Sequence, residues 1–217
     1  MLTVAIVAAL AATAAQAQDN VVKVGVTRYT THSSSNGLTA TPPVFPAGAD
    51  AETGDATTML FVVERTLTSN IGVELALGIP PRISAKGTGA AAALGDELLS
   101  AKNVSPTLLL NYYFGDAANA LRPYVGAGLN YTKFTGVRSS LPTSKLEMSD
   151  SFGWAVQAGL NYAVSKDWGL FASVTRLDVK SDVDAIATIP GVPVPVEVKT
   201  TIDLKPITYS LGLWYRF

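Results

Sequence analysis

Strict alternation of large apolar residues with small or polar ones is the feature that most constrains how this chain can fold. The clearest example is SFGWAVQAGLNYAV, residues 151–164, in which every large apolar side chain occupies an even-numbered position. The odd positions carry only serine, glycine, alanine, glutamine and asparagine. Successive side chains of a β-strand point to opposite faces, so the stretch predicts a strand with one apolar face and one small or polar face.

The same alternation recurs along the chain and predicts an even number of strands. The eight predicted strands span residues 21–29, 57–67, 71–79, 107–114, 124–132, 151–164, 168–179 and 207–217. Short connections at 68–70, 115–121 and 165–167 alternate with long ones at 30–56, 80–105, 135–149 and 180–201. Outer-membrane barrels combine an even number of antiparallel strands with short periplasmic turns and long extracellular loops.

The distribution of glycine indicates which face points outward. The small face carries the glycines at positions 72, 78, 126, 128, 153, 159 and 212. Small residues suit the crowded interior of a narrow barrel, which leaves the large apolar face to contact lipid. A soluble barrel would reverse this arrangement. We therefore predict an all-β fold, an eight-stranded antiparallel transmembrane β-barrel in the lipid of the cell outer membrane.

The N-terminal residues have a different pattern. Residues 1–17, MLTVAIVAALAATAAQA, are apolar and uncharged and end in Ala15-Gln16-Ala17. An apolar stretch that ends in a small-residue tripeptide is typical of a secretory signal peptide and its cleavage site. We therefore expect residues 1–17 to be the signal peptide and residues 18–217 to form the barrel, with an uncleaved membrane anchor as the alternative.

Composition argues against several classes of function. The formal net charge is −1, which provides no electrostatic basis for a nucleic-acid partner. The sequence has no cysteine, and its single histidine, His32, falls in a long connection beside serines. A serine hydrolase needs a histidine oriented by an acid, and no such pattern surrounds His32. We therefore predict no enzyme activity, no cofactor and no metal site.

The inward face combines charged and apolar side chains. Glu64, Glu74 and Arg216 fall near the short-turn ends of their strands and predict a charged cluster at the periplasmic end. Such a cluster is either a structural plug of ion pairs or a barrier that diverts a solute sideways into the bilayer. The apolar candidates for a solute path on the same face are Leu60, Val62, Leu109, Phe171 and Leu177.

The last strand contains a spacing of polar, glycine and aromatic residues that ends on the final position. Its members are Ser210, Gly212, Tyr215 and Phe217. This pattern resembles the signal by which the barrel-assembly machinery recognises outer-membrane substrates, which makes that machinery an expected partner. The alternative interpretation is an ordinary amphipathic strand.

Several blocks of sequence resemble the outer-membrane protein W (OmpW) family. They include NIGVEL at 70–75, YFGD at 113–116, RPYVGAGLNY at 122–131 and WYRF at 214–217. The resemblance extends from the second to the eighth predicted strand. It implies a monomeric barrel that offers a passive route for small hydrophobic molecules, because relatives include uptake proteins for alkanes and aromatic hydrocarbons. The alternative function is a non-transporting receptor, adhesin or stress-response protein that acts through its extracellular loops.

Overall fold

The computed structural model describes residues 20–31, 33–35, 39–43, 49–89, 92, 98–140, 142–188 and 192–217. The predicted signal peptide and His32 lie outside the described residues. Within these described ranges, no helix is both long and apolar enough to span a membrane.

Eight antiparallel strands form a closed barrel, as predicted. Around the barrel they follow the order β12-β13-β16-β1-β5-β6-β9-β10, and β10 pairs back with β12. Their bounds are β1 (Asn20–Thr30), β5 (Ala56–Thr66), β6 (Ile71–Gly78), β9 (Thr107–Tyr113), β10 (Leu121–Ser139), β12 (Ser151–Ala163), β13 (Trp168–Leu177) and β16 (Ile207–Arg216). Closure pairs every barrel strand on both sides, which a sheet in hydrocarbon requires because lipid offers no hydrogen bonds.

The two faces of the barrel wall are those predicted from the alternation. Large apolar side chains face outward, including Leu108, Leu110, Phe152 and Leu211, each at least half exposed. Aromatic residues near the short turns are also exposed and form a girdle: Tyr112, Phe114, Tyr162, Trp168, Tyr215 and Phe217. An apolar outer band with an aromatic girdle is typical of a barrel embedded in lipid.

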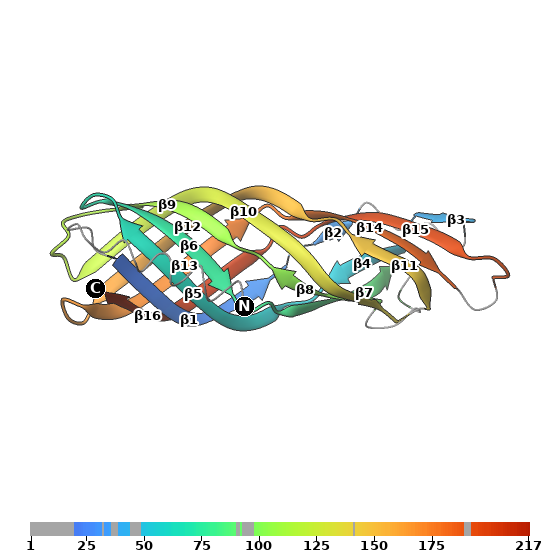
Figure 1. The fold of residues 1–217 in the computed structure, drawn as a ribbon, viewed down its shortest axis with the longest axis horizontal. Coiled ribbons are helices and arrows are strands. Elements are labelled where there is room, and N and C mark those ends of the chain that lie inside the picture. Colours follow the sequence, from blue (N-terminus) through green and yellow to red (C-terminus); the bar gives the residue numbers. More distant parts are fainter. Residues whose placement is uncertain are drawn as a thin grey trace.

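The long connections contain strands that the sequence patterns did not predict. These are β2 (Ser34–Ser35), β3 (Thr39–Thr41), β4 (Ala49–Thr53), β7 (Arg82–Gly89), β8 (Leu99–Val104), β11 (Thr143–Met148), β14 (Lys180–Ala187) and β15 (Val196–Asp203). Strand β10 continues past the barrel wall and pairs with β8. The added strands form an extracellular extension along the long axis of the barrel, at the end opposite the short turns (Figure 1).

The extension has its own apolar core, continuous with the loop-side end of the barrel. Phe134, Val179, Ile202 and Leu204 are buried in one cluster with Leu177 of β13. Here apolar side chains point inward, whereas in the membrane-embedded wall they point outward. The reversal is expected where the wall leaves lipid and enters water, because water favours polar side chains outside.

Candidate functional site

A buried lysine between two glutamates crosses the interior of the barrel. Lys23 of β1 places its Nζ 2.8 Å from Oε2 of Glu64 and 2.8 Å from Oε2 of Glu74. All three side chains are at most 5% exposed. The Lys23 Nζ also lies 5.0 Å from the centroid of the Tyr124 ring, a favourable cation–π position.

Neutral donors complete the coordination of both carboxylates. The Tyr113 hydroxyl donates to Glu64 Oε2 at 2.6 Å. Asn111 Nδ2 and Gln157 Nε2 donate to the two oxygens of Glu74 at 3.0 and 3.2 Å. Buried ions are tolerated only with such good geometry and additional hydrogen bonds. We call this set the plug, and its members are Lys23, Glu64, Glu74, Asn111, Tyr113, Tyr124 and Gln157.

Glycines on the inner wall provide the space that the plug occupies. A Cβ atom at Gly72 would collide with the Glu64 carboxylate, and one at Gly159 would collide with the Tyr124 ring. The small face recognised in the sequence is therefore a packing requirement of the charged and aromatic side chains that cross a narrow barrel.

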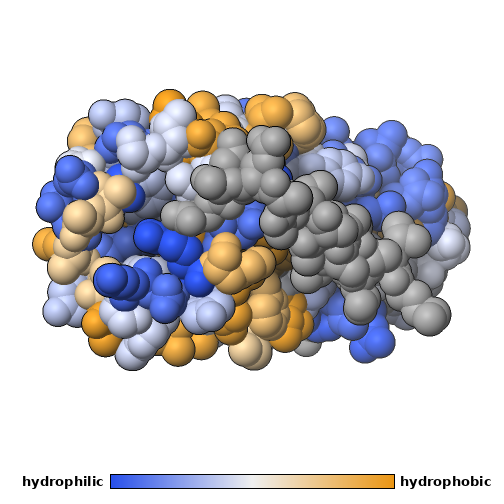
Figure 2. Space-filling model, turned by 60° about the vertical axis from the view of Figure 1, so that its left-hand side comes forward, coloured by the Kyte–Doolittle hydropathy of each residue, from blue (hydrophilic) through white to orange (hydrophobic). Residues whose placement is uncertain are grey.

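The plug separates two cavities. The lumen cavity, on the loop side, has a volume of about 90 Å³ and is lined in part by Lys23, Glu74 and Tyr124. The turn-side cavity has a volume of about 570 Å³ and is lined in part by Glu64 and Tyr113. The two cavities share no lining residue. Figure 2, with the turn end forward, shows hydrophilic residues in the hollow of this end and hydrophobic ones around it.

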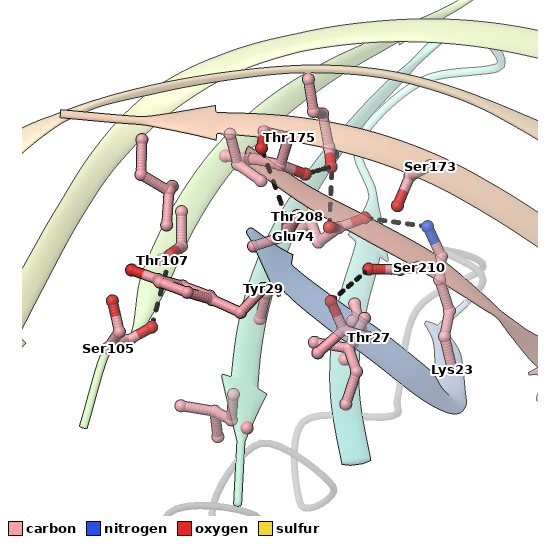
Figure 3. Close-up of a pocket in the computed structure, with 18 of the residues that line it drawn as sticks. Lys23, Thr27, Tyr29, Glu74, Ser105, Thr107, Ser173, Thr175, Thr208 and Ser210 are labelled. Atoms are coloured by element: carbon pink, nitrogen blue, oxygen red, sulfur yellow. Dashed lines mark hydrogen bonds and ion pairs between the residues drawn. The ribbon is translucent and has the colours of Figure 1, made fainter. Parts of the chain in front are cut away.

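All five predicted path residues line the lumen cavity, namely Leu60, Val62, Leu109, Phe171 and Leu177. Hydroxyl groups of the same wall bond to other protein atoms. The Ser210 and Thr27 hydroxyls lie 2.9 Å apart, and Thr58 donates to the Ile79 carbonyl at 2.6 Å. Figure 3 shows the Thr27–Ser210 pair and the Lys23–Glu74 ion pair on the cavity wall. With their hydroxyls bonded, the threonines still offer methyl groups to a solute.

The structure adds a cation to the predicted charged cluster of Glu64, Glu74 and Arg216. Glu64 and Glu74 lie directly opposite each other on β5 and β6, as the short connection between these strands allows. Lys23 pairs with both glutamates, and Arg216 lines the turn-side cavity together with Glu64. Arg216 and Glu64 are both opposite Val21 on β1, two residues nearer the turns than Lys23, a shift of about 6–7 Å.

Sequence reasoning omitted Lys23, although the alternation contains a signal for it. Lys23 shares its strand face with Thr27 and Tyr29, while the valines at positions 22, 24 and 26 occupy the other face. A lysine on the inward face of a membrane strand requires an acidic partner. The predicted cluster therefore lacked the cation that pairs with both glutamates.

The four residues of the predicted assembly signal divide between the two faces of β16. Ser210 points inward toward Thr27, and Gly212 lies against the backbone of β1. Tyr215 and Phe217 are exposed, with ring centroids 6.4 Å apart. Recognition of these residues by the assembly machinery stays a prediction.

Comparison with known proteins agrees with this architecture. The model of the OmpW family matches residues 16–217. Outer membrane protein W of Salmonella typhi is 37% identical over 157 residues, which cover 69% of this chain and 68% of the relative. Outer membrane protein AlkL of Ectopseudomonas oleovorans is 31% identical and covers 78% of this chain and 70% of its own.

A solved structure shares the same fold. The crystal structure of the outer membrane protein OprG from Pseudomonas aeruginosa superposes with a TM-score of 0.83 at 24% identity, covering 93% of this chain and 97% of that chain. The fold and the named relatives place the protein in the outer membrane. Because the family model matches nearly its whole length, the chain belongs to the OmpW family.

Proposed function

We propose that the protein is a monomeric, non-enzymatic barrel that provides a passive route for small hydrophobic molecules across the outer membrane. The observation that carries this proposal is the lumen cavity, in which leucine, valine and phenylalanine side chains line the wall among threonines and serines, and which ends on the plug. The family resemblance supports the same class of solute.

The character of the cavity wall favours an apolar solute. Leu109 and Phe171 are each only 2% exposed, and with Leu60 they provide a hydrocarbon surface inside the barrel. The cavity volume of about 90 Å³ is smaller than the ~150 Å³ apolar cavity known to bind benzene. A narrow chain or a single ring is therefore the largest solute expected to enter, and its entry requires small side-chain movements.

The plug argues against passage along the barrel axis. A hydrocarbon beside Lys23, Glu64 and Glu74 would displace their partners, and a buried charge without its partners is costly. Transfer of an apolar solute from the lumen into surrounding lipid is favourable. A water-filled pore would require a larger barrel, since porins have about 16 strands. We infer that a solute leaves sideways, between strands.

Uptake measurements test the proposal directly. Cells that lack the gene would be complemented with the native chain or with Leu109→Asn or Phe171→Asn, which place an amide in the cavity wall. We expect both variants to reduce uptake of short alkanes and single-ring aromatics. Leu109→Met and Phe171→Leu keep the wall apolar and should preserve uptake.

Folding is checked for each variant by its heat-modifiable mobility on gels. Full uptake by well-folded asparagine variants would contradict a route through the lumen. It would favour the alternative of a receptor or adhesin that acts through the extracellular extension.

A further inference from the structure

Three neighbouring strands at the base of the extension carry basic residues and no acidic ones. Strands β7, β8 and β10 contain Arg82, Lys102 and Lys133 on their exposed face, and none of the three strands contains Asp or Glu. Strand β8 pairs with β7 on one side and β10 on the other. We call Arg82, Lys102 and Lys133 the basic patch.

The strand register brings these cations close together. Arg82 and Lys102 are directly opposite each other, which places their Cβ atoms about 5 Å apart. Lys102 is opposite Thr135, so Lys133 is its diagonal neighbour on the same face, at about 7–8 Å. Like charges directly opposite each other destabilise a sheet. The arrangement therefore lowers the stability of this sheet, and an anion between the cations would reduce that loss.

The chain does not provide that anion among its described residues. None of the ion pairs formed within the described ranges involves Arg82, Lys102 or Lys133. Asp150 lies near the outer face of β10, where it accepts a hydrogen bond from the Tyr131 hydroxyl at 2.5 Å, and it forms none of the ion pairs found among the described residues.

Arg82 is nevertheless held in place. Its Nη1 donates to the Ser100 hydroxyl and to the Gly136 carbonyl, each at 3.2 Å. A comparable exposed arginine on β1, Arg28, pairs with Asp55 at 3.0 Å. The basic patch thus differs from the opposite part of the rim, where the protein neutralises its own cation.

The patch lies at the loop-side edge of the apolar band. On the outer face of β10, Lys133 follows Leu129 and Tyr131, which are 51% and 40% exposed. Across the strand pair, Lys133 is opposite Val104, which is 37% exposed. Lipid headgroups occupy this height along a membrane barrel. On the loop side they belong to the outer leaflet, whose lipid in Gram-negative bacteria is a phosphorylated glycolipid.

We propose that the basic patch binds the phosphate groups of the outer-leaflet glycolipid and fixes one such lipid against the base of the extension. Arginine and lysine both bind phosphate oxygens through charge-assisted hydrogen bonds. The neighbouring apolar residues Leu129 and Val104 contact the acyl chains of the same lipid. Binding also relieves the repulsion between Arg82 and Lys102.

Lipid binding to the purified full chain in neutral detergent tests this proposal. Native mass spectrometry would compare phosphorylated lipid A with its dephosphorylated form, for the native chain and for Lys102→Gln/Lys133→Gln. This double variant leaves the structural contacts of Arg82 intact. Because each basic residue at an anionic lipid surface contributes about a factor of five, we expect about a 25-fold loss of affinity.

The matched control is Arg28→Gln/Lys145→Gln, which removes the same charge from exposed cations that pair with Asp55 and Glu147. It should bind phosphorylated lipid A like the native chain. An equal loss in this control, or unchanged binding by the patch variant after a gel-mobility check of folding, would overturn the proposal. Equal affinity for phosphorylated and dephosphorylated lipid A, or for lipid A and phosphatidylglycerol, would also overturn it. Displacement of bound lipid A by inorganic phosphate alone would have the same consequence.

Discussion

Replacement of Lys23 by methionine tests the energetics of the plug. Methionine keeps most of the apolar stem of the lysine but removes the charge that lies 2.8 Å from both glutamates. The Lys23 side chain is 1% exposed, so water cannot replace the lost ammonium group. Removal of one partner from a buried ion pair costs about 3–5 kcal/mol, and here two carboxylates lose the same cation. We expect the free energy of unfolding to fall by at least this amount.

Urea unfolding in phospholipid vesicles, followed by tryptophan fluorescence and gel mobility, would measure the change. The triple variant Lys23→Met/Glu64→Gln/Glu74→Gln removes all three charges and should regain most of the lost stability, because a neutral replacement of a buried ion cluster is often tolerated. The surface control is Lys145→Met, whose exposed pair with Glu147 contributes about 0–1 kcal/mol.

Two results would refute this reasoning. If the free energy of unfolding of Lys23→Met lies within about 1 kcal/mol of that of the native chain, the plug is not an energetically coupled ion cluster. If the triple variant is as unstable as the single one, the lost stability comes from packing of the lysine stem and not from the unpaired carboxylates.

Three further predictions follow from the topology, the lipid face and the inner wall. In intact cells, a cysteine placed at Thr143 should react with a membrane-impermeant label, whereas one at Lys166 should stay protected; the reverse pattern would contradict the topology. Leu160→Arg should lower the free energy of unfolding from vesicles by about 2–4 kcal/mol if it lies near the midplane, and Leu160→Ala by much less. Gly159→Ala forces a Cβ into a buried tyrosine ring and should cost about 1–3 kcal/mol, while Gly78→Ala has room and should be nearly neutral in the same urea titration.

The membrane-embedded wall could be predicted from sequence because burial and strand geometry act on every second residue there. Phe152, Trp154 and Val156 had to face one way once their stretch was recognised as a strand. Lipid on one side and a crowded lumen on the other give a uniform rule, and the strands and faces predicted from it are confirmed.

In the extension, apolar side chains point inward and not outward, so its strands were not predicted from the sequence. Beyond Thr132, β10 points Phe134 inward and Lys133 outward, so apolar residues no longer mark the outer face. A search for apolar-outward strands ends at this position, and the predicted strand 124–132 stops where the observed strand continues to Ser139. The same reversal explains Leu177, which was predicted as a path residue and also belongs to the core of the extension.

The plug shows a second limit, because strand register across a long connection is not fixed by local sequence. Glu64 and Glu74 could be placed together, since the turn between β5 and β6 sets their pairing. The position of Lys23 relative to Glu64 depends on how β1 pairs with β5 across residues 31–55, and that register places Lys23 beside Val62. Arg216 is opposite Val21, as Glu64 is, and it lines the turn-side cavity on which Glu64 also lies.

The narrow barrel links the plug to the function proposed for the lumen. Eight strands leave room for little more than side chains, so a charged cluster that crosses the interior separates the lumen cavity from the turn-side cavity. Gly72 and Gly159 make room for the plug, because the Glu64 carboxylate and the Tyr124 ring occupy the space that a Cβ atom at these positions would need. A larger residue at either position would displace plug residues that hold one another by ion pairs and hydrogen bonds. The separation of the two cavities therefore depends on these glycines as well as on the charges of the plug.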